Sequence, residues 1–188
     1  MSDKNSVLDF LLSRRSGPAK LLGAPGPGRA ELEVILRAGA RAPDHGKLEP
    51  WRFVVLTGAG RERFARQVRE RAAVTGQDAD KGALAFEQAP VAVAVIASPK
   101  TSEKIPELEQ TLSTGAVALG VLNAALASGW GANWLTAWPA YDRTLVEEGL
   151  GLEPNEWVAA FVHIGTASTT PPERPRPDMQ SITTWIEA

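Results

Sequence analysis

A continuous apolar run rich in valine constrains the fold of this chain more than any other feature. Between Pro90 and Ala97 no side chain is charged or polar. Such a run predicts a strand buried on both faces, because a half-exposed strand alternates apolar with polar residues. A second apolar run, Trp157 to Gly165, predicts another such strand, with His163 as a buried core residue. The two runs predict a central sheet with helices packed around it.

The rest of the pattern divides into helices and short strands. Further strands are expected at residues 51–57 and 130–136. The order of elements contains no regular βαβ repeat with phosphate-binding turns. We therefore predict an α+β fold, a mostly antiparallel central sheet surrounded by helices, in a single domain spanning residues 1–188. The predicted helices cover residues 6–15, 30–40, 61–74, 107–128 and 142–149, with a polar turn at residues 76–81.

The longest predicted helix, residues 107–128, has one face rich in leucine, which we expect to be its core face. Its remaining faces hold many small residues, including Gly115 and Gly120, which predict close approach by neighbouring elements. We expect this helix to be buried on several sides and to end at Gly129. Its expected core face consists of Leu108, Leu112, Ala116, Leu119, Leu122 and Leu126.

Two segments rich in proline are expected to lie outside the sheet. Residues 16–29 contain a Gly/Pro run, but Pro25 and Pro27 lack the N–H groups that a phosphate-binding loop requires, so a connector is favoured. Residues 170–188 are predicted to form an extended C-terminal arm, because their prolines prevent a helix. The arm ends in a β-prone stretch, residues 181–186, and suggests a homodimer with exchanged arms.

The composition excludes several kinds of site and partner. The chain has no cysteine, which excludes disulfides, thiolate metal sites and cysteine nucleophiles, and two histidines are too few for a histidine metal cluster. The net charge of -2 gives no indication of a nucleic-acid or anionic-membrane partner. The N-terminus is polar, and no apolar run approaches the roughly 20 residues of a membrane span. We therefore expect a cytoplasmic protein.

The chemistry available to side chains is limited. The sequence contains no GxGxxG, P-loop, GxSxG or HExxH pattern, so a reaction would depend on a bound cofactor. Arg14, Arg15 and Ser16 follow one another at the end of the first predicted helix, with the two arginines in its last turn. Two guanidinium groups and a hydroxyl can bind a phosphate. The alternative, that the basic residues only complement the helix dipole, is not excluded by the spacing.

Two other groups of residues also admit two interpretations. The loop from Arg41 to His45 is either a plain polar turn or part of a ligand site. Trp130, Trp134 and Trp138 either border a planar cofactor or pack in the core.

Taken together and in order, these segments resemble the nitroreductase family of flavoproteins over nearly the whole chain. The Arg-Arg-Ser motif is similar to the family's N-terminal motif. The Ala-Pro-Asp-His sequence, the Pro-Trp pair and the glycine that ends the long helix resemble later blocks. The similar segments are residues 14–16, 36–45, 49–53, 128–131, 134–136 and 161–166.

The resemblance implies a homodimer with two FMN molecules at the subunit interface. The N-terminal motif would hold the ribityl phosphate and the flavin edge, and the loop after the second helix would reach the flavin from the partner subunit. The family pattern assigns FMN contacts to Arg14, Arg15, Ser16, Arg41, His45, Trp134, Leu135, Thr136, Arg174 and Arg176, and assigns NAD(P)H to Ala124, Ala125, Leu126, Ala127, Ser128 and Gly129.

The resemblance implies an NAD(P)H-dependent oxidoreductase. Hydride would pass through FMN to a small acceptor such as a nitroaromatic or a quinone. The reaction would need no side chain as acid or base, and no metal. The chain departs from the family pattern at Lys20, where an arginine nearer the serine is common. It also departs at Glu49, usually glutamine, and at Gly120, often asparagine. The alternatives are a flavin storage or sensor protein, a different flavin reaction such as dehalogenation or flavin cleavage, and a protein that binds no flavin.

Overall fold

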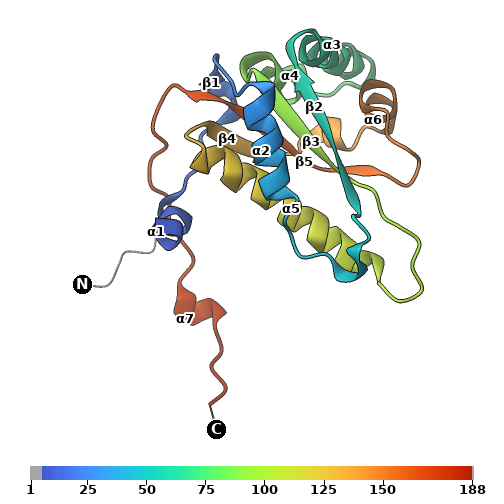
Figure 1. Cartoon of the computed structure of the whole chain (residues 1–188). Helices are drawn as coiled ribbons and strands as arrows, with labels where there is room; N and C mark the ends of the chain where they lie inside the picture. Colours follow the sequence, from blue (N-terminus) through green and yellow to red (C-terminus); the bar gives the residue numbers. More distant parts are fainter. Residues whose placement is uncertain (1–5, 188) are drawn as a thin grey trace.

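A computed structural model describes residues 6–187, and its centre is a five-stranded sheet (Figure 1). The strands lie in the order β1-β5-β3-β2, and β4 also pairs with β5. Every pairing within the described residues is antiparallel, which confirms the predicted type of sheet. The strands are β1 (Leu22–Gly23), β2 (Trp51–Thr57), β3 (Val91–Ala97), β4 (Gly131–Leu135) and β5 (Trp157–Ala167).

The valine-rich run forms β3, which lies between β2 and β5. All seven of its residues are buried. Val91, Val93 and Val95 contact one core cluster, whereas Ala92 and Ala94 contact the other, as the alternation of side chains along a strand requires. The prediction of a strand buried on both faces is confirmed.

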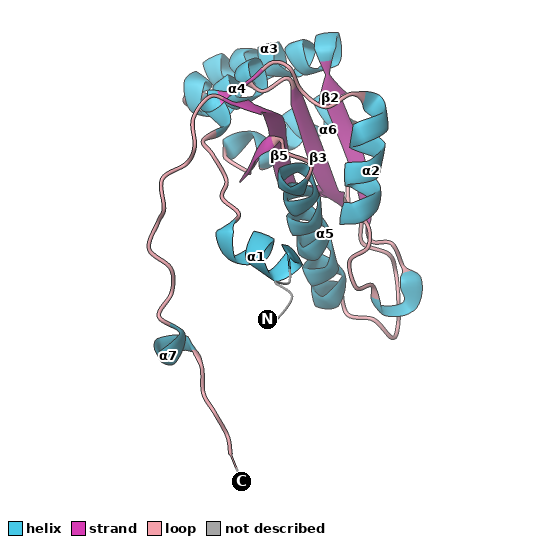
Figure 2. Cartoon of the chain, turned by 60° about the vertical axis from the view of Figure 1, so that its left-hand side comes forward, coloured by secondary structure: helices cyan, strands magenta, loops and turns pink. Residues whose placement is uncertain are grey.

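Helices cover both faces of the sheet (Figure 2). One core cluster joins α3, α4 and α6 to the sheet around the rings of Phe64, Phe86 and Phe161, whose centroids lie 4.9, 5.0 and 6.0 Å apart. The other cluster joins α2 and α5 to the opposite face. The helices are α1 (Ser6–Ser13), α2 (Arg29–Gly39), α3 (Gly58–Thr75), α4 (Ala79–Gln88), α5 (Glu107–Ala127), α6 (Arg143–Leu150) and α7 (Met179–Ile182), with the 3₁₀ turns η1 (Ala19–Leu21), η2 (His45–Lys47) and η3 (Trp138–Ala140).

The core face of α5 differs from the predicted one. Leu108, Leu112 and Leu119 are exposed in the single chain. Small and β-branched side chains face the sheet instead, because they allow the helix to approach it closely. At the crossing with α2, a Cβ on Gly120 would lie 2.9 Å from the Cα of Gly39, so the small residues mark a close approach as expected. The buried residues are Gln110, Thr114, Val117, Ala118, Val121, Leu122 and Ala125.

By length and composition alone, α5 is also the one helix within residues 6–187 that could cross a membrane. The expectation that no segment reaches this length and composition is therefore wrong. The packing of α5 against α2, β3, β4 and β5 accounts for its apolar character. We assign it as a core helix.

One helix and one strand in the body of the molecule are missing from the sequence-based prediction. The first is α4, which begins in the predicted polar turn, where the Asp78 side chain accepts a hydrogen bond from the Lys81 backbone N–H at 3.0 Å. Its apolar pattern is interrupted by Gly82, where a Cβ would lie 2.6 Å from the Trp138 ring. The second is β1, whose two residues in the Gly/Pro-rich connector are too few to show a period.

After β5 the chain leaves the body of the molecule as an arm (Figures 1 and 2). The predicted β-prone end, residues 181–186, is wrong in the structure, because α7 includes its first two residues and the rest forms no strand. Asp178 caps α7 by accepting a hydrogen bond from the Gln180 N–H at 3.0 Å. Trp185 and Ile186 are 80% and 95% exposed, so the arm presents apolar side chains that the described chain does not cover.

Candidate functional site

The Arg-Arg-Ser motif lies directly after α1 rather than in its last turn, because α1 ends at Ser13. Arg14, Arg15 and Ser16 are half-buried, and Nη2 of Arg14 donates a hydrogen bond to Oγ of Ser16 at 3.0 Å. Burial lowers the pKa of Arg14, and the positive charges of Arg176 and Arg15 lower it further. Within residues 6–187, Arg14 has no carboxylate ion-pair partner. The motif therefore concentrates positive charge.

The arm places a further arginine beside this motif. Arg15 donates to the carbonyl of Pro172 and forms an ion pair with Glu173. The same carboxylate lies 3.3 Å from Nε of Arg176. Arg174 is exposed, and its backbone N–H donates to Glu173 at 3.0 Å. The structure thus brings Arg15 and Arg176 together around one carboxylate, with Arg174 next to them in the chain.

A hollow of about 340 Å³ lies between the motif, the end of α5 and the segment after β5. Leu126 and Gly129 reach it from the predicted NAD(P)H segment. Gly129 has a φ of +87°, which ends α5 as predicted. We call this space the arginine hollow; its lining is Arg15, Gly17, Leu126, Gly129, Trp130, Gly131, Ala167, Ser168, Thr169, Thr170 and Pro171.

Three buried N–H donors near the arginine hollow have no aligned acceptor among the described residues. They are Nε of Arg14, Nη1 of Arg15 and Nε1 of Trp130. Nη1 of Arg15 faces Glu173 as an ion pair but without hydrogen-bond geometry. A buried donor without an acceptor costs about 1–3 kcal/mol. Such a group of donors, two of them charged, fits an anion that supplies several oxygen acceptors.

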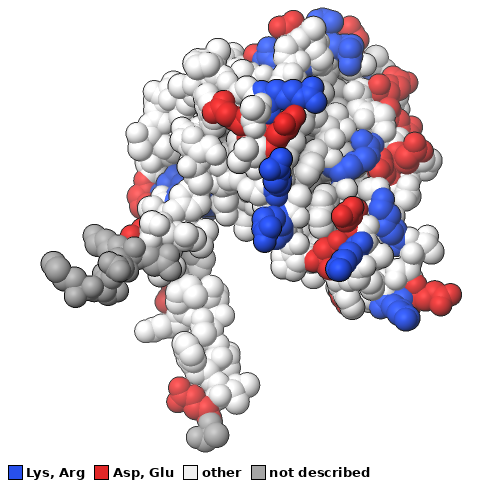
Figure 3. All heavy atoms as spheres, viewed as in Figure 1, with Lys and Arg blue, Asp and Glu red and all other residues white. Residues whose placement is uncertain are grey.

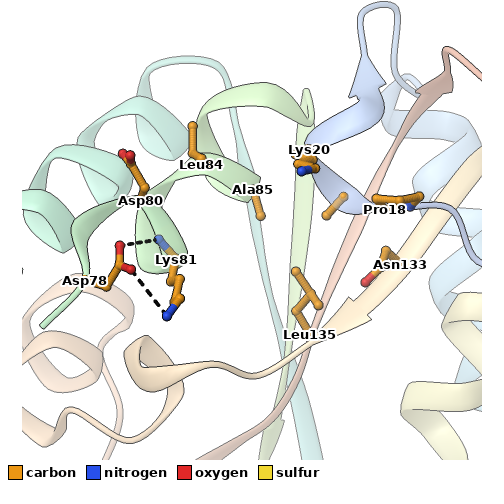
Figure 4. A pocket seen from close by; sticks show the side chains of 10 residues that line it. Pro18, Lys20, Asp78, Asp80, Lys81, Leu84, Ala85, Asn133 and Leu135 are labelled. Atoms are coloured by element: carbon orange, nitrogen blue, oxygen red, sulfur yellow. Dashed lines mark hydrogen bonds and ion pairs between the residues drawn. The ribbon is translucent and has the colours of Figure 1, made fainter.

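A second hollow, of about 460 Å³, lies between β4, η1 and α4 (Figure 4). Asn133 and Leu135 reach it from the same face of β4, because residues two apart in a strand share a face. Lys81 contacts Asp78 at its rim, with Nζ and Oδ2 3.5 Å apart. We call this space the β4 hollow; its lining is Pro18, Ala19, Lys20, Asp78, Asp80, Lys81, Leu84, Ala85, Asn133 and Leu135.

One hydrogen bond connects the two hollows. Nδ2 of Asn133, in the β4 hollow, donates to the carbonyl of Gly17, in the arginine hollow, at 2.5 Å. The sequence-based prediction did not include Asn133 or the donor of Trp130. The available signal was a polar side chain within a strand, on the same face as Leu135.

Of the three residues at the end of β4 that were predicted to contact the flavin, only one lines a hollow. Leu135 lines the β4 hollow, while Trp134 faces the other side of the strand, and both are 37% exposed. Thr136 follows β4 and is half-buried. Trp138 donates to the Asp78 carbonyl at 3.0 Å and packs on α4, so it is a packing residue.

Arg41 and His45 lie apart from this region in the single chain. His45 is near the start of α5, where its Nδ1 lies 2.7 Å from Oε2 of Glu109. The axial distance along α5 from Glu109 to Leu126 is about 26 Å at 1.5 Å per residue. Arg41 is exposed after the end of α2. One chain therefore cannot bring His45 to the arginine hollow.

His163 is a buried core residue, as predicted. It is 1% exposed, and burial lowers its pKa to about 4 despite a hydrogen bond to the carbonyl of Ala85. Its ring lies 4.8 Å from that of Phe86. Among residues 6–187, no group of three or more His, Asp or Glu side chains could hold a metal ion.

Comparisons with known proteins agree on one family. A model described as "Nitroreductase family" matches residues 11–166. The chain is 36% identical over 163 residues to the Escherichia coli (strain K12) protein named "Putative NAD(P)H nitroreductase YdjA", covering 85% of this chain and 87% of that one. A Haemophilus influenzae protein named "Putative NAD(P)H nitroreductase" is 34% identical over 167 residues, covering 85% and 88%.

Solved structures share the fold at lower identity. A nitroreductase-like family protein from Bacillus cereus superposes with a TM-score of 0.83 at 22% identity, and the match covers 100% of both chains. A mutant of NfnB, described as an FMN and NADPH-dependent nitroreductase from a Sphigopyxis strain, superposes with a TM-score of 0.75 at 21% identity, covering 95% and 97%. These two likenesses show a common fold.

Proposed function

The chain belongs to the nitroreductase family and is an oxidoreductase, and from this premise we propose that it transfers hydride from NAD(P)H, through non-covalently bound FMN, to an organic acceptor such as a nitroaromatic or a quinone. The names of its relatives mention NAD(P)H, and that of NfnB mentions FMN and NADPH. When bound, FMN supplies the hydride chemistry at its N5 atom. The residues of this chain then bind, orient and shield it.

The observation that carries this proposal is the set of three buried N–H donors around the arginine hollow that have no aligned acceptor among residues 6–187. The FMN phosphate is an anion with several oxygen acceptors. Arg14 and Arg15 would bind it through charge-assisted hydrogen bonds, with Ser16 fixing Arg14. Arg176 and Arg174 would add charge from the arm. Loss of the Glu173 contact to Arg15 would release that side chain for the phosphate.

The β4 hollow fits the flavin ring. Its apolar lining includes Leu84, Ala85 and Leu135, suitable for a planar ring, and its polar rim includes Lys20 and Lys81. The backbone of Trp134, Leu135 and Thr136 would line the ring along β4, with the side chain of Leu135 facing it. The end of α5, residues 124–129, borders the arginine hollow through Leu126 and Gly129 and would face NAD(P)H.

A homodimer would complete this site. Because His45 lies at the opposite end of α5 from the arginine hollow, it would reach a flavin only from a second subunit, and Arg41, in the same loop, would accompany it. The exposed leucines of α5, Leu108, Leu112 and Leu119, supply an apolar surface for that subunit. In this proposal the arm, residues 170–188 of a single domain, crosses to the partner.

Deletion of residues 171–188 tests the arm. We expect the shortened chain to become monomeric in light scattering at concentrations at which the full chain is dimeric. A shortened chain that remains dimeric would contradict the exchanged arm but not the flavin site.

The charge pattern supports a small-molecule partner rather than a nucleic acid. On the face in Figure 3, basic and acidic side chains are intermixed and form no continuous basic surface. The arm in the same view is mostly uncharged, in keeping with a protein partner. We propose a cytoplasmic enzyme.

The purified protein tests the function directly. We expect a yellow protein with flavin absorbance, bleached by NADH or NADPH without oxygen and recoloured by a nitroaromatic or a quinone. A yellow protein that neither nucleotide bleaches would instead be a flavin storage or sensor protein. A colourless protein that does not bind added FMN would contradict the proposal.

A further inference from the structure

We infer that Asn133 is a flavin-binding residue whose side-chain carbonyl accepts a hydrogen bond from a ribityl hydroxyl, while its amide nitrogen holds the loop after the arginine pair. This inference rests on the proposed flavin function. It adds a specificity contact in the middle of the site, between the phosphate and the ring.

The orientation of the Asn133 amide follows from its partner. The carbonyl of Gly17 can only accept a hydrogen bond, so the group 2.5 Å from it must be the amide nitrogen. Oδ1 of Asn133 therefore faces the other way. It is buried and has no donor among the described residues. A buried acceptor without a donor fits a ligand that carries an N–H or O–H group.

The position of Asn133 indicates which part of the ligand supplies this donor. On one side, Asn133 is bonded to Gly17, one residue after the Arg-Arg-Ser motif. On the other side, Leu135 lies about 7 Å further along the same face of β4, where the ring would rest. The ribityl chain joins the phosphate to the ring and carries hydroxyl donors. Asn133 Oδ1 thus lies where a hydroxyl of this chain would pass (Figure 4).

A purely structural role for Asn133 predicts a different result. If the side chain only held the Gly17 loop, its removal would disturb the arginine pair and weaken ligands that carry a phosphate. If Oδ1 binds the ribityl chain, removal weakens every ligand with that chain, phosphorylated or not. FMN, riboflavin and lumiflavin separate these roles, because riboflavin lacks the phosphate and lumiflavin lacks the ribityl chain as well.

The experiment titrates flavin-free full-length protein with each of the three flavins and follows flavin fluorescence. For Asn133→Ala we expect the dissociation constant of riboflavin to rise roughly three- to tenfold, the range for a neutral hydrogen bond, and that of FMN to rise at least as much, because the lost bond to Gly17 also affects the arginine pair. The constant for lumiflavin should not change. Asn155→Ala is the matched control, because Nδ2 of Asn155 also donates to a carbonyl, that of Pro99, at 3.3 Å. It should leave all three constants unchanged.

Asn133→Asp keeps an acceptor but removes the donor to Gly17, as Asn133→Ala does. We expect it to bind riboflavin nearly as well as the wild type. Equal losses of riboflavin in the two variants, a loss confined to FMN in Asn133→Ala, or an equal loss of lumiflavin would overturn the inference. A wild-type protein that binds none of the three flavins would instead overturn the proposed function. Thermal unfolding of each variant confirms that it is folded.

Discussion

Two arginine clusters at different places in the molecule differ in how completely their polar atoms are satisfied. In the closed cluster, Arg52 donates to both carboxylate oxygens of Glu156, at 2.8 and 2.6 Å, and to the carbonyl of Gly151 at 2.8 Å. Arg143 donates to the carbonyls of Glu156 and Glu153, at 2.6 and 2.5 Å. No side-chain atom of this cluster is left buried without a partner.

The open cluster consists of Arg14, Arg15 and Arg176. It has the same residue type as the closed cluster, but not all of its buried donors have acceptors. Nε of Arg14 and Nη1 of Arg15 are buried without aligned acceptors in the described residues. Glu173 on the exposed arm is the carboxylate that pairs with Arg15 and Arg176. The comparison indicates that arginine content alone says little about function. An arginine whose buried donors are all paired within its own chain stabilises the fold, whereas one that keeps a buried donor without an aligned acceptor is available for a ligand.

Acidification should affect the core beside the β4 hollow and the closed cluster in different pH ranges. His163 hydrogen-bonds the carbonyl of Ala85, which lines the β4 hollow, and burial lowers its pKa from 6.5 to about 4. Between these values the unfolded chain binds a proton that the folded chain does not. This contribution to stability is complete above about pH 6.5 and is lost as the pH falls to about 4, a change of roughly 3 kcal/mol.

The closed cluster should respond only at lower pH. The hydrogen bond from Arg52 lowers the pKa of Glu156 from 4.5 to about 2, so its contribution is complete above about pH 4.5 and is lost as the pH falls towards 2. Urea unfolding at a series of pH values checks both ranges. His163→Gln should abolish the pH dependence between 6.5 and 4 and keep the lower one. An unchanged upper range in that variant would contradict the role of His163.

Arg52→Ala should separate stability from binding. It leaves Glu156, whose side chain is 5% exposed, without its partner. Removing one partner of a buried ion pair costs about 3–5 kcal/mol, and because Arg52 is itself partly exposed we expect about 2 kcal/mol. This corresponds to a melting temperature lower by roughly 4–8 °C. Flavin affinity at a temperature where the protein is folded should not change; a large loss of affinity would contradict the distinction between the clusters.

Glu109→Gln should have the smallest effect. Its contact with His45 joins two side chains that are 47% and 63% exposed, and exposed pairs contribute about 0–1 kcal/mol. Thermal unfolding should therefore shift by at most a few degrees. If His45 reaches the flavin of a partner subunit, the rate of flavin release from the dimer should increase modestly. A monomer-sized species with the same release rate would contradict the contribution from the partner.

The parts of the fold that the sequence predicts best are those with a clear period. β2 and β3 match their predicted ranges closely, because their apolar runs are bounded by turns and buried by neighbours on the sheet. The face of α5 was predicted only in part: Leu122 is buried as predicted, but other leucines taken as core residues are exposed. The structure buries Val117 and Val121 there instead, where α5 must come close to the sheet and to Gly39. Hydrophobicity does not distinguish a core face from an apolar face left for a partner.

The candidate site was predictable where it consists of one short motif. Residue types alone could propose Arg14 to Ser16 as an anion site, but they left open the alternative that the basic residues only complement the helix dipole. The bond between Asn133 and Gly17 spans 116 positions in the sequence, and no local pattern indicates it. The contact of Arg15 with Glu173 also depends on the path of the arm. Such contacts arise from the fold, so the sequence alone could suggest the arginines but not their unsatisfied donors.

Flavin binding by Arg15→Ala measures the central claim most directly. A charge-assisted hydrogen bond contributes about 1.5–3 kcal/mol. We therefore predict that the dissociation constant of FMN rises roughly 10- to 100-fold, while that of riboflavin, which has no phosphate, stays the same. Arg52→Ala, the variant in the closed cluster, should change neither constant. Equal affinities of wild type and Arg15→Ala for FMN, or an equal loss of riboflavin, would contradict the assignment of the open cluster to the flavin phosphate.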